Sequence, residues 1–295
     1  MKKKKGIDFP KRIERLSDEM LRSVVHSAII EDLDGRGDIT TTALFGELSE
    51  ASRTGRIFAK ESGIVCGVYV AARVYSMVSS SISIEIEHHK KDGEFVNQGD
   101  TLMVIKGKPS AITTGERIAL NFLGLLSGIS TKVNRYVKLL DGTPTKLLDT
   151  RKTLPGLREL QKYAVATGGG YNHRLGLYDM ILIKDNHIAA VGSVARAVEL
   201  AKKAYPMVTV EIETATLEQV AEAVETDADI LMLDNMDNVM VREAMKIIDG
   251  AKHIEVSGNI DEKRLRELGD IGVDFVSMGE LTHTVRNLDL SLLIE

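Results

Sequence analysis

Basic residues gather in one stretch of this chain, between Asp149 and His187. The stretch holds six Lys and Arg residues against four Asp and Glu, a net charge of +2, whereas the whole chain of 295 residues carries −5. Like charges held close together are costly unless an anion neutralises them. The stretch therefore predicts a binding site for a small molecule with several carboxylates or phosphates.

Four cations of this stretch could bind such an anion. Arg151 and Arg174 carry planar guanidinium groups that bind a carboxylate through two hydrogen bonds, while Lys152 and Lys184 offer compact charges suited to phosphate. Any one of them could instead make an ordinary surface salt bridge. His173 is either a hydrogen-bond donor to the ligand or a histidine satisfied within the fold.

The neighbouring residues are less specific. The glycine run 168–170 allows positive φ angles and a close approach to a ligand, but a tight turn alone would also explain it. Arg158 and Lys162 lie on a short helical segment at 157–163, and we expect both to be solvated.

Two carboxylates, Glu213 and Asp234, end successive predicted strands. Because no Cys or His pair has zinc spacing, the metal that they favour is Mg²⁺, held partly through water and bridging a substrate phosphate. They could also hold sugar hydroxyls or stabilise a developing oxocarbenium charge. Glu211 shares a strand face with Glu213, so the assignment between the two stays open.

Small and polar residues follow the last two predicted strands. Ser257-Gly258-Asn259 comes after one, and Ser277-Met278-Gly279-Glu280 ends the other. In barrel enzymes the phosphate site commonly forms from backbone N–H groups at these positions. We therefore predict a site for a phosphorylated sugar, a divalent metal and a polyanionic second substrate.

The elements that must position these groups alternate from residue 145 onward. Six apolar runs predict strands and four periodic segments predict helices, which implies parallel strands with right-handed crossovers. The strands are expected at 146–148, 180–183, 208–212, 230–233, 254–256 and 275–278, with a doubtful seventh at 164–167, and the helices at 194–204, 217–224, 239–248 and 262–268. A complete eight-stranded barrel needs ~250 residues, so an incomplete α/β barrel is predicted over 116–281.

The first part of the chain has a different pattern. A helix is predicted over 17–33 with Ser17 as its cap, and strands over 55–59, 63–67, 82–87 and 101–105. A long helix over 113–140 leads into the barrel. We therefore expect a mixed-sheet domain over 1–115, with residues 282–295 packing back on it.

Bulk composition excludes several classes of protein. The acidic chain has no Trp and 4% aromatic residues, which disfavours nucleic-acid binding. No apolar run is long enough for a membrane span, and no apolar segment follows the Lys-rich start, as a signal peptide would require. The single cysteine, Cys66, lies in an apolar run and is expected in the core, which suits a reducing cytoplasm.

The chain resembles the quinolinate phosphoribosyltransferase family. The resemblance rests on long gapped motifs, Asp149-Thr150-Arg151-Lys152-Thr153, Gly168-Gly169-Gly170-Tyr171-Asn172-His173-Arg174 and Ile183-Lys184-Asp185-Asn186-His187. Further matches are Glu31-Asp32, Gly37-Asp38-Ile39-Thr40, Glu116-Arg117, Leu233-Asp234-Asn235-Met236 and Ser257-Gly258-Asn259-Ile260. They extend from about Val24 to Leu288.

The resemblance implies an N-terminal open-faced α/β sandwich domain and an incomplete, type II phosphoribosyltransferase-like α/β barrel. It implies conversion of quinolinate and phosphoribosyl pyrophosphate to nicotinate mononucleotide, pyrophosphate and CO₂ in NAD synthesis, with Mg²⁺ and no organic cofactor. It also implies a homodimer with shared active sites, and leaves open a further assembly into hexamers.

The same resemblance implies a role for each site residue. The quinolinate carboxylates would be held by Arg151, His173, Arg174 and Lys184, with Arg117 reaching in from the neighbouring subunit. Lys152 would meet the phosphates, while Glu213 and Asp234 would meet the ribose hydroxyls and the metal. The 5′-phosphate would be held by Ser257, Gly258, Asn259, Ser277 and Gly279.

Three alternatives are weighed against this function. A related pyrophosphorylase-like protein associated with molybdate transport tends to lose the lysine that is present here as Lys184. A Schiff-base aldolase would use Lys184 as its nucleophile. A non-catalytic phosphosugar-binding module would not need to keep Glu213, Asp234 and Lys184 together.

Overall fold

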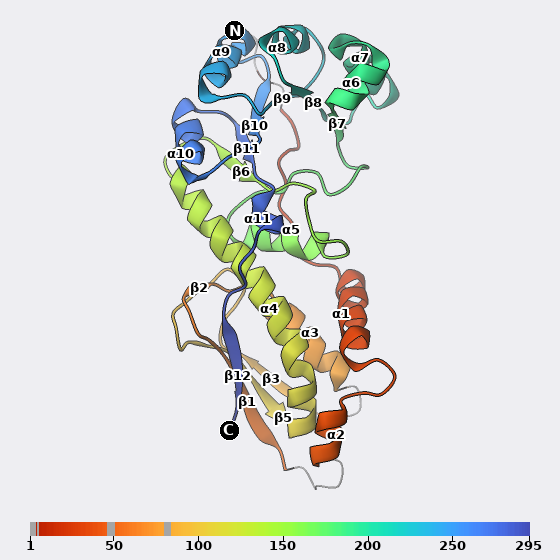
Figure 1. The fold of residues 1–295 in the computed structure, drawn as a ribbon, viewed down its shortest axis with the longest axis vertical. Helices are drawn as coiled ribbons and strands as arrows, with labels where there is room; N and C mark the ends of the chain where they lie inside the picture. The colour runs from red at the N-terminus through yellow and green to blue at the C-terminus, as the bar shows by residue number, and fades with distance from the viewer. Residues whose placement is uncertain (1–3, 5, 46–50, 80–83) are drawn as a thin grey trace. The chain divides into compact units, whose positions relative to one another are not determined.

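The computed structural model describes residue 4 and residues 6–45, 51–79 and 84–295 (Figure 1). The chain divides into two compact units. Unit 1 comprises Met1–Arg12, Arg135–Thr153 and Gly170–Glu280, and unit 2 comprises Ile13–Asn134, Leu154–Gly169 and Leu281–Glu295. The boundary expected at residues 115/116 falls inside helix α4 (Pro109–Val137), which continues through it without a break.

Unit 2 is built on an antiparallel sheet of four strands in the order β12-β1-β5-β3. These strands are β1 (Arg53–Ala59), β3 (Glu85–His88), β5 (Thr101–Gly107) and β12 (Leu290–Ile294). Strand β12 pairs with β1 over Gly55–Ala59, so the end of the chain joins this sheet. A two-stranded sheet pairs β2 (Gly63–Ile64) with β4 (Phe95–Val96). The strand predicted at 82–87 begins on two residues that lie outside the described ones.

The helices of unit 2 bury apolar residues in its core. Helix α1 (Asp18–Leu33) begins at its predicted cap, where the Ser17 hydroxyl accepts the Met20 N–H, and packs on α3 (Val68–Val78). The other helices are α2 (Ile39–Phe45), most of α4, α5 (Arg158–Thr167) and the last three residues of α11 (Glu280–His283). The periodicity did not predict α3, because Val and Tyr dominate its sequence and are typical of strands.

Helix α5 corrects two predictions. The prediction of a doubtful strand at 164–167 is wrong, since these residues form the last turn of α5. Lys162, expected to be solvated, is fully buried. The glycine run after α5 has a packing reason, because a Cβ atom at Gly168 would lie 2.6 Å from the backbone oxygen of Ser130 on α4.

Unit 1 contains a parallel sheet of six strands in the order β6-β11-β10-β9-β8-β7. The strands are β6 (Lys146–Leu148), β7 (Ile181–Ile183), β8 (Val210–Thr214), β9 (Ile230–Asp234), β10 (His253–Ser257) and β11 (Phe275–Ser277). Because β6 and β7 are edge strands in this order, the barrel is incomplete, as the sequence predicts. Its apolar core includes Leu148, Ile230 and Phe275.

Helices connect these strands and pack along the sheet (Figure 1). They are α6 (Asp185–Val191), α7 (Val194–Ala204), α8 (Leu217–Val224), α9 (Asn238–Ile248) and α10 (Glu262–Ile271), with the short 3₁₀ helix η1 (Lys138–Leu140) before β6. Four of the five were predicted, and α6 was missed because it is short and has no buried face. The alternation of strand and helix directs the carboxyl ends of all six strands to one edge of the sheet.

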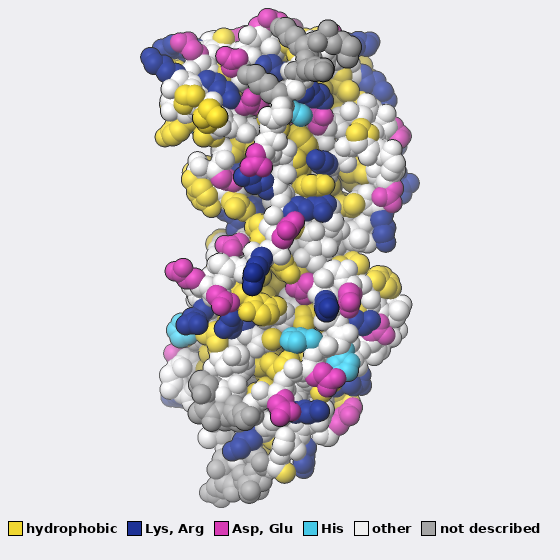
Figure 2. All heavy atoms as spheres, turned by 180° about the vertical axis from the view of Figure 1, so that it is seen from behind, with side chains coloured by type: hydrophobic (Ala, Val, Ile, Leu, Met, Phe, Trp, Pro, Cys, Tyr) yellow, Lys and Arg dark blue, Asp and Glu magenta, His cyan; other side chains and the backbone are white. Residues whose placement is uncertain are grey.

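Two further expectations concern the chain as a whole. Among the described residues, no helix combines the length and the apolar character that crossing a bilayer requires. Cys66 is buried, as predicted for a core cysteine, and burial raises the pKa of its thiol far above the ordinary value. On the face shown in Figure 2, Lys and Arg side chains are interspersed with Asp and Glu.

Candidate active site

A cavity of about 300 Å³ lies within unit 1 at the carboxyl ends of the parallel strands. Seven residues predicted from the sequence line it: Arg151, Lys152, His173, Arg174, Lys184, Ser257 and Ser277. They come from the ends of four strands and from the irregular segment between α5 and β7. The sheet therefore brings together groups that are far apart in the chain.

Two arginines of this cavity, Arg151 and Arg174, lie close enough for their positive charges to repel each other. Arg174 is buried, and burial together with the neighbouring charge of Arg151 lowers the pKa of its guanidinium. Its Nη1 donates to the Met180 carbonyl oxygen at 3.2 Å. The buried Nε of Arg151 has no hydrogen-bond partner among the described residues. An anion in the cavity would supply both the missing acceptor and the missing negative charge.

Lys184 and Glu213 form a close ion pair at the same edge of the sheet. Lys184 is the N-cap residue of α6, and Glu213 is the fourth residue of β8. A Schiff-base lysine is activated by desolvation or by a neighbouring cation, whereas the Lys184 side chain is half exposed and lies against a carboxylate. The pair therefore counts against the aldolase alternative.

The loops after β9 and β10 are held in a defined conformation. Gly258 has φ +94°, and a Cβ atom there would lie 2.2 Å from Asn235 Oδ1. Asn259 has φ +51° and donates from Nδ2 to Asn235 Oδ1 at 3.2 Å. Arg264 of α10 donates to the Gly258 carbonyl oxygen at 2.7 Å. This small-residue loop before a helix N-terminus is typical of a phosphate site.

Other predicted residues lie outside the cavity lining. Gly258, Asn259, Gly279 and Asp234 are not among the described residues that line it, although Asp234 pairs in register with Ser257 on the neighbouring strand. Arg117 is exposed on α4 in unit 2. Their substrate contacts stay predictions.

Both nitrogens of His173 face protein groups. The ring Nδ1 accepts the backbone N–H of Arg174 at 2.7 Å. Because an acceptor nitrogen carries no proton, the ring proton is on Nε2. Nε2 lies 2.9 Å from Glu211 Oε2 and 3.5 Å from Glu255 Oε2. His173 also lines the cavity, and its contact with a ligand stays a prediction.

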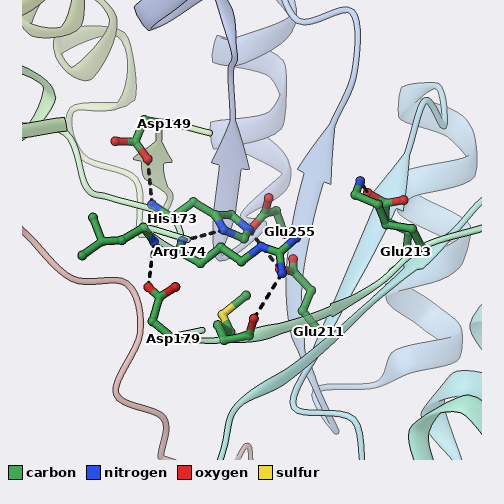
Figure 3. Close-up of polar contacts among 10 residues, drawn as sticks. Asp149, His173, Arg174, Asp179, Glu211, Glu213 and Glu255 are labelled. Carbon is green, nitrogen blue, oxygen red and sulfur yellow. Dashed lines mark hydrogen bonds and ion pairs between the residues drawn. The ribbon is translucent and has the colours of Figure 1, made fainter. Parts of the chain in front are cut away.

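The segment around His173 is also held by the buried carboxylate of Asp149. Asp149 Oδ1 accepts the His173 backbone N–H at 2.9 Å, and Asp149 Oδ2 accepts Asn172 Nδ2 at 2.8 Å. Asp179 accepts the backbone N–H groups of Leu175 and Gly176 (Figure 3). Every residue from 172 to 176 is therefore held by a side chain, which fixes the base of the cavity.

Glu211 and Glu255 are fully buried against the His173 ring, and Glu255 also lines the cavity, while Glu213 lies apart from them (Figure 3). Burial raises the pKa of both carboxyls well above their ordinary range. Glu255 is a buried acid that was not predicted from the sequence. The available signal was a Glu two residues before the polar residue that ends β10, the same spacing as Glu211 and Glu213 on β8.

Two metal arrangements can be compared on this structure. Glu213 and Asp234 end adjacent strands and supply the oxygen donors that Mg²⁺ takes together with waters and substrate phosphates, so they fit this ion. His173, Glu211 and Glu255 also offer three ligand atoms within 4.8 Å of one another. Nε2 of His173 carries a proton, however, and a metal ligand must be deprotonated.

The fold and the site define an α/β protein with a cationic cavity at the carboxyl edge of an incomplete barrel. Comparison with known proteins gives the family. Residues 38–127 match the family model described as "Quinolinate phosphoribosyl transferase, N-terminal domain", and residues 129–293 match the model of the corresponding C-terminal domain. The chain belongs to the quinolinate phosphoribosyl transferase family.

Similar proteins cover nearly the whole chain. A "probable nicotinate-nucleotide pyrophosphorylase [carboxylating]" from Bacillus subtilis is 41% identical over 273 residues, which is 92% of each chain. The chloroplastic nicotinate-nucleotide pyrophosphorylase of Arabidopsis thaliana is 38% identical, covering 93% of this chain and 83% of that one. The structure of the nicotinate-nucleotide pyrophosphorylase from Francisella tularensis is 38% identical with a TM-score of 0.92, covering 97% of this chain and all of that one. The predicted fold class is thereby confirmed.

Proposed function

We propose that this protein converts quinolinate and phosphoribosyl pyrophosphate to nicotinate mononucleotide, pyrophosphate and CO₂ in de novo NAD synthesis. The observation that carries the proposal is the cavity of unit 1, in which two arginines and two lysines face one space. A dicarboxylic aromatic acid and a pyrophosphorylated sugar are anions of the required size and charge. Membership of the family supports the same reaction.

The dicarboxylic acid is bound by the two arginines of the cavity, with Lys184 beside them. Arg151 has an unsatisfied Nε donor, and Arg174 is fixed in position by the Met180 carbonyl. Each guanidinium can hold one carboxylate through two hydrogen bonds. Lys184 leaves Glu213 to meet a carboxylate, and Glu213 is then available to a ribose hydroxyl. Lys152 meets the phosphates.

The reaction needs orientation more than it needs a protein nucleophile. The pyridine nitrogen attacks the anomeric carbon, pyrophosphate leaves, and the carboxylates of Glu213 and Asp234 stabilise the positive charge that develops on the sugar. The resulting pyridinium nitrogen stabilises the electron pair left at C2 when CO₂ departs, and a proton then replaces the lost carboxyl. Correct orientation of the two substrates can contribute roughly 7–11 kcal/mol.

Mg²⁺ would be held by Glu213 and Asp234 through water, together with the pyrophosphate of the sugar substrate. When bound, it neutralises charge on the leaving pyrophosphate. The loop of Ser257, Gly258 and Asn259, with Ser277 and Gly279, would hold the 5′-phosphate. The positive φ angles of Gly258 and Asn259 support this role, since such turns point backbone N–H groups into one concavity.

We propose further that the protein acts as a cytoplasmic homodimer with shared active sites. The exposed guanidinium of Arg117 on α4 is available to reach the neighbouring subunit's cavity. Arg117→Ala should then abolish activity without unfolding the protein. Heterodimers of Arg117→Ala and Arg151→Ala subunits should recover a fraction of the sites, measured as specific activity after subunit exchange. Exchanged heterodimers without recovery would contradict shared sites.

One assay tests the reaction itself. Purified protein is supplied with Mg²⁺, phosphoribosyl pyrophosphate and either quinolinate or nicotinate, and nucleotide and CO₂ are measured. We expect nicotinate mononucleotide and CO₂ from quinolinate only. Turnover of nicotinate would mean that the contacts to the second carboxylate are misassigned. Folded protein that turns over neither acid would refute the proposal.

A further inference from the structure

One arginine of unit 1 joins two loops of the candidate site. Arg264 lies in the first turn of α10, and its guanidinium contacts both the loop after β9 and the loop after β10. Nη1 donates to the carbonyl oxygens of Gly258 at 2.7 Å and of Asn259 at 3.2 Å. Nη2 donates to the carbonyl oxygen of Met236. Because β9 and β10 are neighbours in the sheet, one side chain holds the ends of two adjacent strands together.

All three nitrogens of this guanidinium donate to neutral groups. The third, Nε, lies 3.4 Å from Asn238 Oδ1, and Asn238 donates in turn to Glu267 on α10 at 2.6 Å. Within the described part of the chain, Arg264 makes no ion pair with an acidic side chain. An arginine that only balanced surface charge would pair with a carboxylate, so these bonds indicate that Arg264 is used to hold the loop backbone.

The bonds from Arg264 fix the direction of two peptide groups in the loop after β10. In a planar trans peptide, the C=O of one residue and the N–H of the next point in opposite directions. Because the Gly258 and Asn259 oxygens point at Arg264, the N–H groups of Asn259 and Ile260 point away from it. Neither N–H group donates to another group among the described residues. Two successive N–H donors on one side of a turn are what an anion site requires.

The backbone of this loop needs outside support to keep that direction. Gly258 and Asn259 both have positive φ, at +94° and +51°, and this region is unfavourable for a residue with a side chain such as Asn259. Such a conformation persists only when the surrounding structure holds it. A peptide group turned over would aim its carbonyl oxygen at the phosphate, and the two negative groups would repel each other. Arg264 opposes this rotation by binding the oxygens on the other side of the loop.

Resting on the proposed function, we propose that Arg264 is a positioning residue for the 5′-phosphate of phosphoribosyl pyrophosphate. Arg264 is not among the described residues that line the cavity. It acts through the loop, by holding the carbonyl oxygens toward α10 so that the N–H groups of Asn259 and Ile260 meet the phosphate. The carboxylates of quinolinate are bound elsewhere in the cavity, by Arg151 and Arg174. The effect of Arg264 therefore falls on one substrate and not on the other.

Three variants separate this role from the effects of charge and of stability. Arg264→Gln removes both the charge and the bonds to the loops. Arg264→Lys keeps the charge, but its single nitrogen cannot replace the two that reach the two loops at once. Arg266→Gln is the matched control, because Arg266 is an exposed arginine of the same helix.

The experiment measures KM for each substrate, at temperatures well below the melting temperature of every variant. We expect both Arg264 variants to raise KM for phosphoribosyl pyrophosphate by roughly tenfold or more, the effect of losing one hydrogen bond to a charged group. KM for quinolinate should change far less, and Arg266→Gln should change neither. Recovery of the wild-type KM in Arg264→Lys would mean that charge alone acts. That recovery, or an equal rise in both KM values, would overturn the proposal.

A binding measurement needs no turnover. Inorganic phosphate is titrated into ¹⁵N-labelled protein, and the backbone amide signals of Asn259 and Ile260 are followed by NMR. We expect phosphate to shift both signals in the wild type and in Arg266→Gln, and to bind more weakly to Arg264→Gln. A wild type without these shifts, or equal phosphate binding by all three proteins, would refute the role of Arg264. A wild type that shows the shifts but cannot use quinolinate would refute the proposed function alone.

Discussion

The buried polar groups of the two units differ in kind. Among the described residues of unit 1, five of the nine buried polar groups are ionisable, namely Asp149, His173, Arg174, Glu211 and Glu255, and the other four are Thr145, Asn172, Thr214 and Ser277. In unit 2 the described buried polar groups are mainly hydroxyls and an amide, namely Thr41, Ser79, Ser127, Ser130, Gln161 and Thr282, with Lys162 as the charged exception. The two units therefore differ in the chemical type of the polar groups that they bury.

The hydroxyls of unit 2 satisfy backbone groups. The Ser127 hydroxyl accepts the Cys66 N–H at 2.9 Å and donates to the Cys66 carbonyl oxygen at 3.1 Å. Ser130 donates to the Ala164 carbonyl oxygen at 2.8 Å. Such bonds are what folding itself requires. The buried charges of unit 1 add a desolvation cost that the fold does not require, which indicates that they are kept for binding.

The largest test of this difference removes an apolar side chain from unit 2. Ile57 of β1 is fully buried, so Ile57→Ala should lower the free energy of unfolding by roughly 2–5 kcal/mol. Denaturant titration measures this change. Because Ile57 contributes nothing to the cavity of unit 1, KM for quinolinate should stay at its wild-type value at temperatures well below the melting point. A changed KM would show that the two units do not divide stability and binding as we infer.

The converse test removes a buried cation from unit 1. Arg174→Ala should reduce kcat/KM for quinolinate by roughly a hundredfold, the ~3 kcal/mol typical of losing one partner of a buried charge pair. Steady-state kinetics with varied quinolinate measures the loss. Arg196→Ala is the matched control, because Arg196 on α7 is half exposed and pairs only with Glu199 in the ion pairs described. Equal losses in both variants would remove the special role of the cavity.

A smaller effect distinguishes the two ends of the parallel sheet. Asp274 precedes β11, at the end of the sheet opposite the cavity. Burial alone would raise its pKa, but the His253 ring, whose Nδ1 lies 3.7 Å from Oδ1, and hydrogen bonds from Lys4 and the Ile254 N–H lower the pKa to about 2. Because the folded pKa lies below the unfolded value of about 4, the ionised group stabilises the fold above pH 4, and this contribution is lost as the pH falls toward 2.

Asp274→Asn should therefore cost about 2 kcal/mol of stability at pH 7, and this cost should shrink as the pH falls from 4 to 2. Denaturant titrations of both proteins across this pH range measure the difference. Quinolinate turnover at pH 7 should be unaffected, since residues at this end of a barrel sheet contribute to stability and the active site lies at the other end. A cost that is independent of pH would mean that the carboxylate charge is not what stabilises this end.

The periodic parts of the fold could be predicted from the sequence. Helices α7 and α8 have the bounds that the apolar spacing gives, and all six parallel strands lie within two residues of the predicted ranges. Helix α3 could not be predicted, because the burial of Val70 and Val74 in the folded protein outweighs the strand preference of its residues. The prediction that Lys162 is solvated failed for a similar reason, since only the packing of α5 buries the helix face that carries this side chain.

The features of the site also divide into those that the sequence predicts and those that only the structure decides. The residue types at the strand ends were enough to predict a polyanion site, because parallel strands bring their carboxyl ends to one edge whatever the details of packing. The sequence by itself therefore determined the fold class, the cationic cavity and the carboxylates beside it. Only the tertiary structure decided that His173 faces Glu211 and Glu255, and that Lys184 faces Glu213. These pairings depend on how far each strand is shifted against its neighbours and on which side chains exclude water, and neither property is local in the chain.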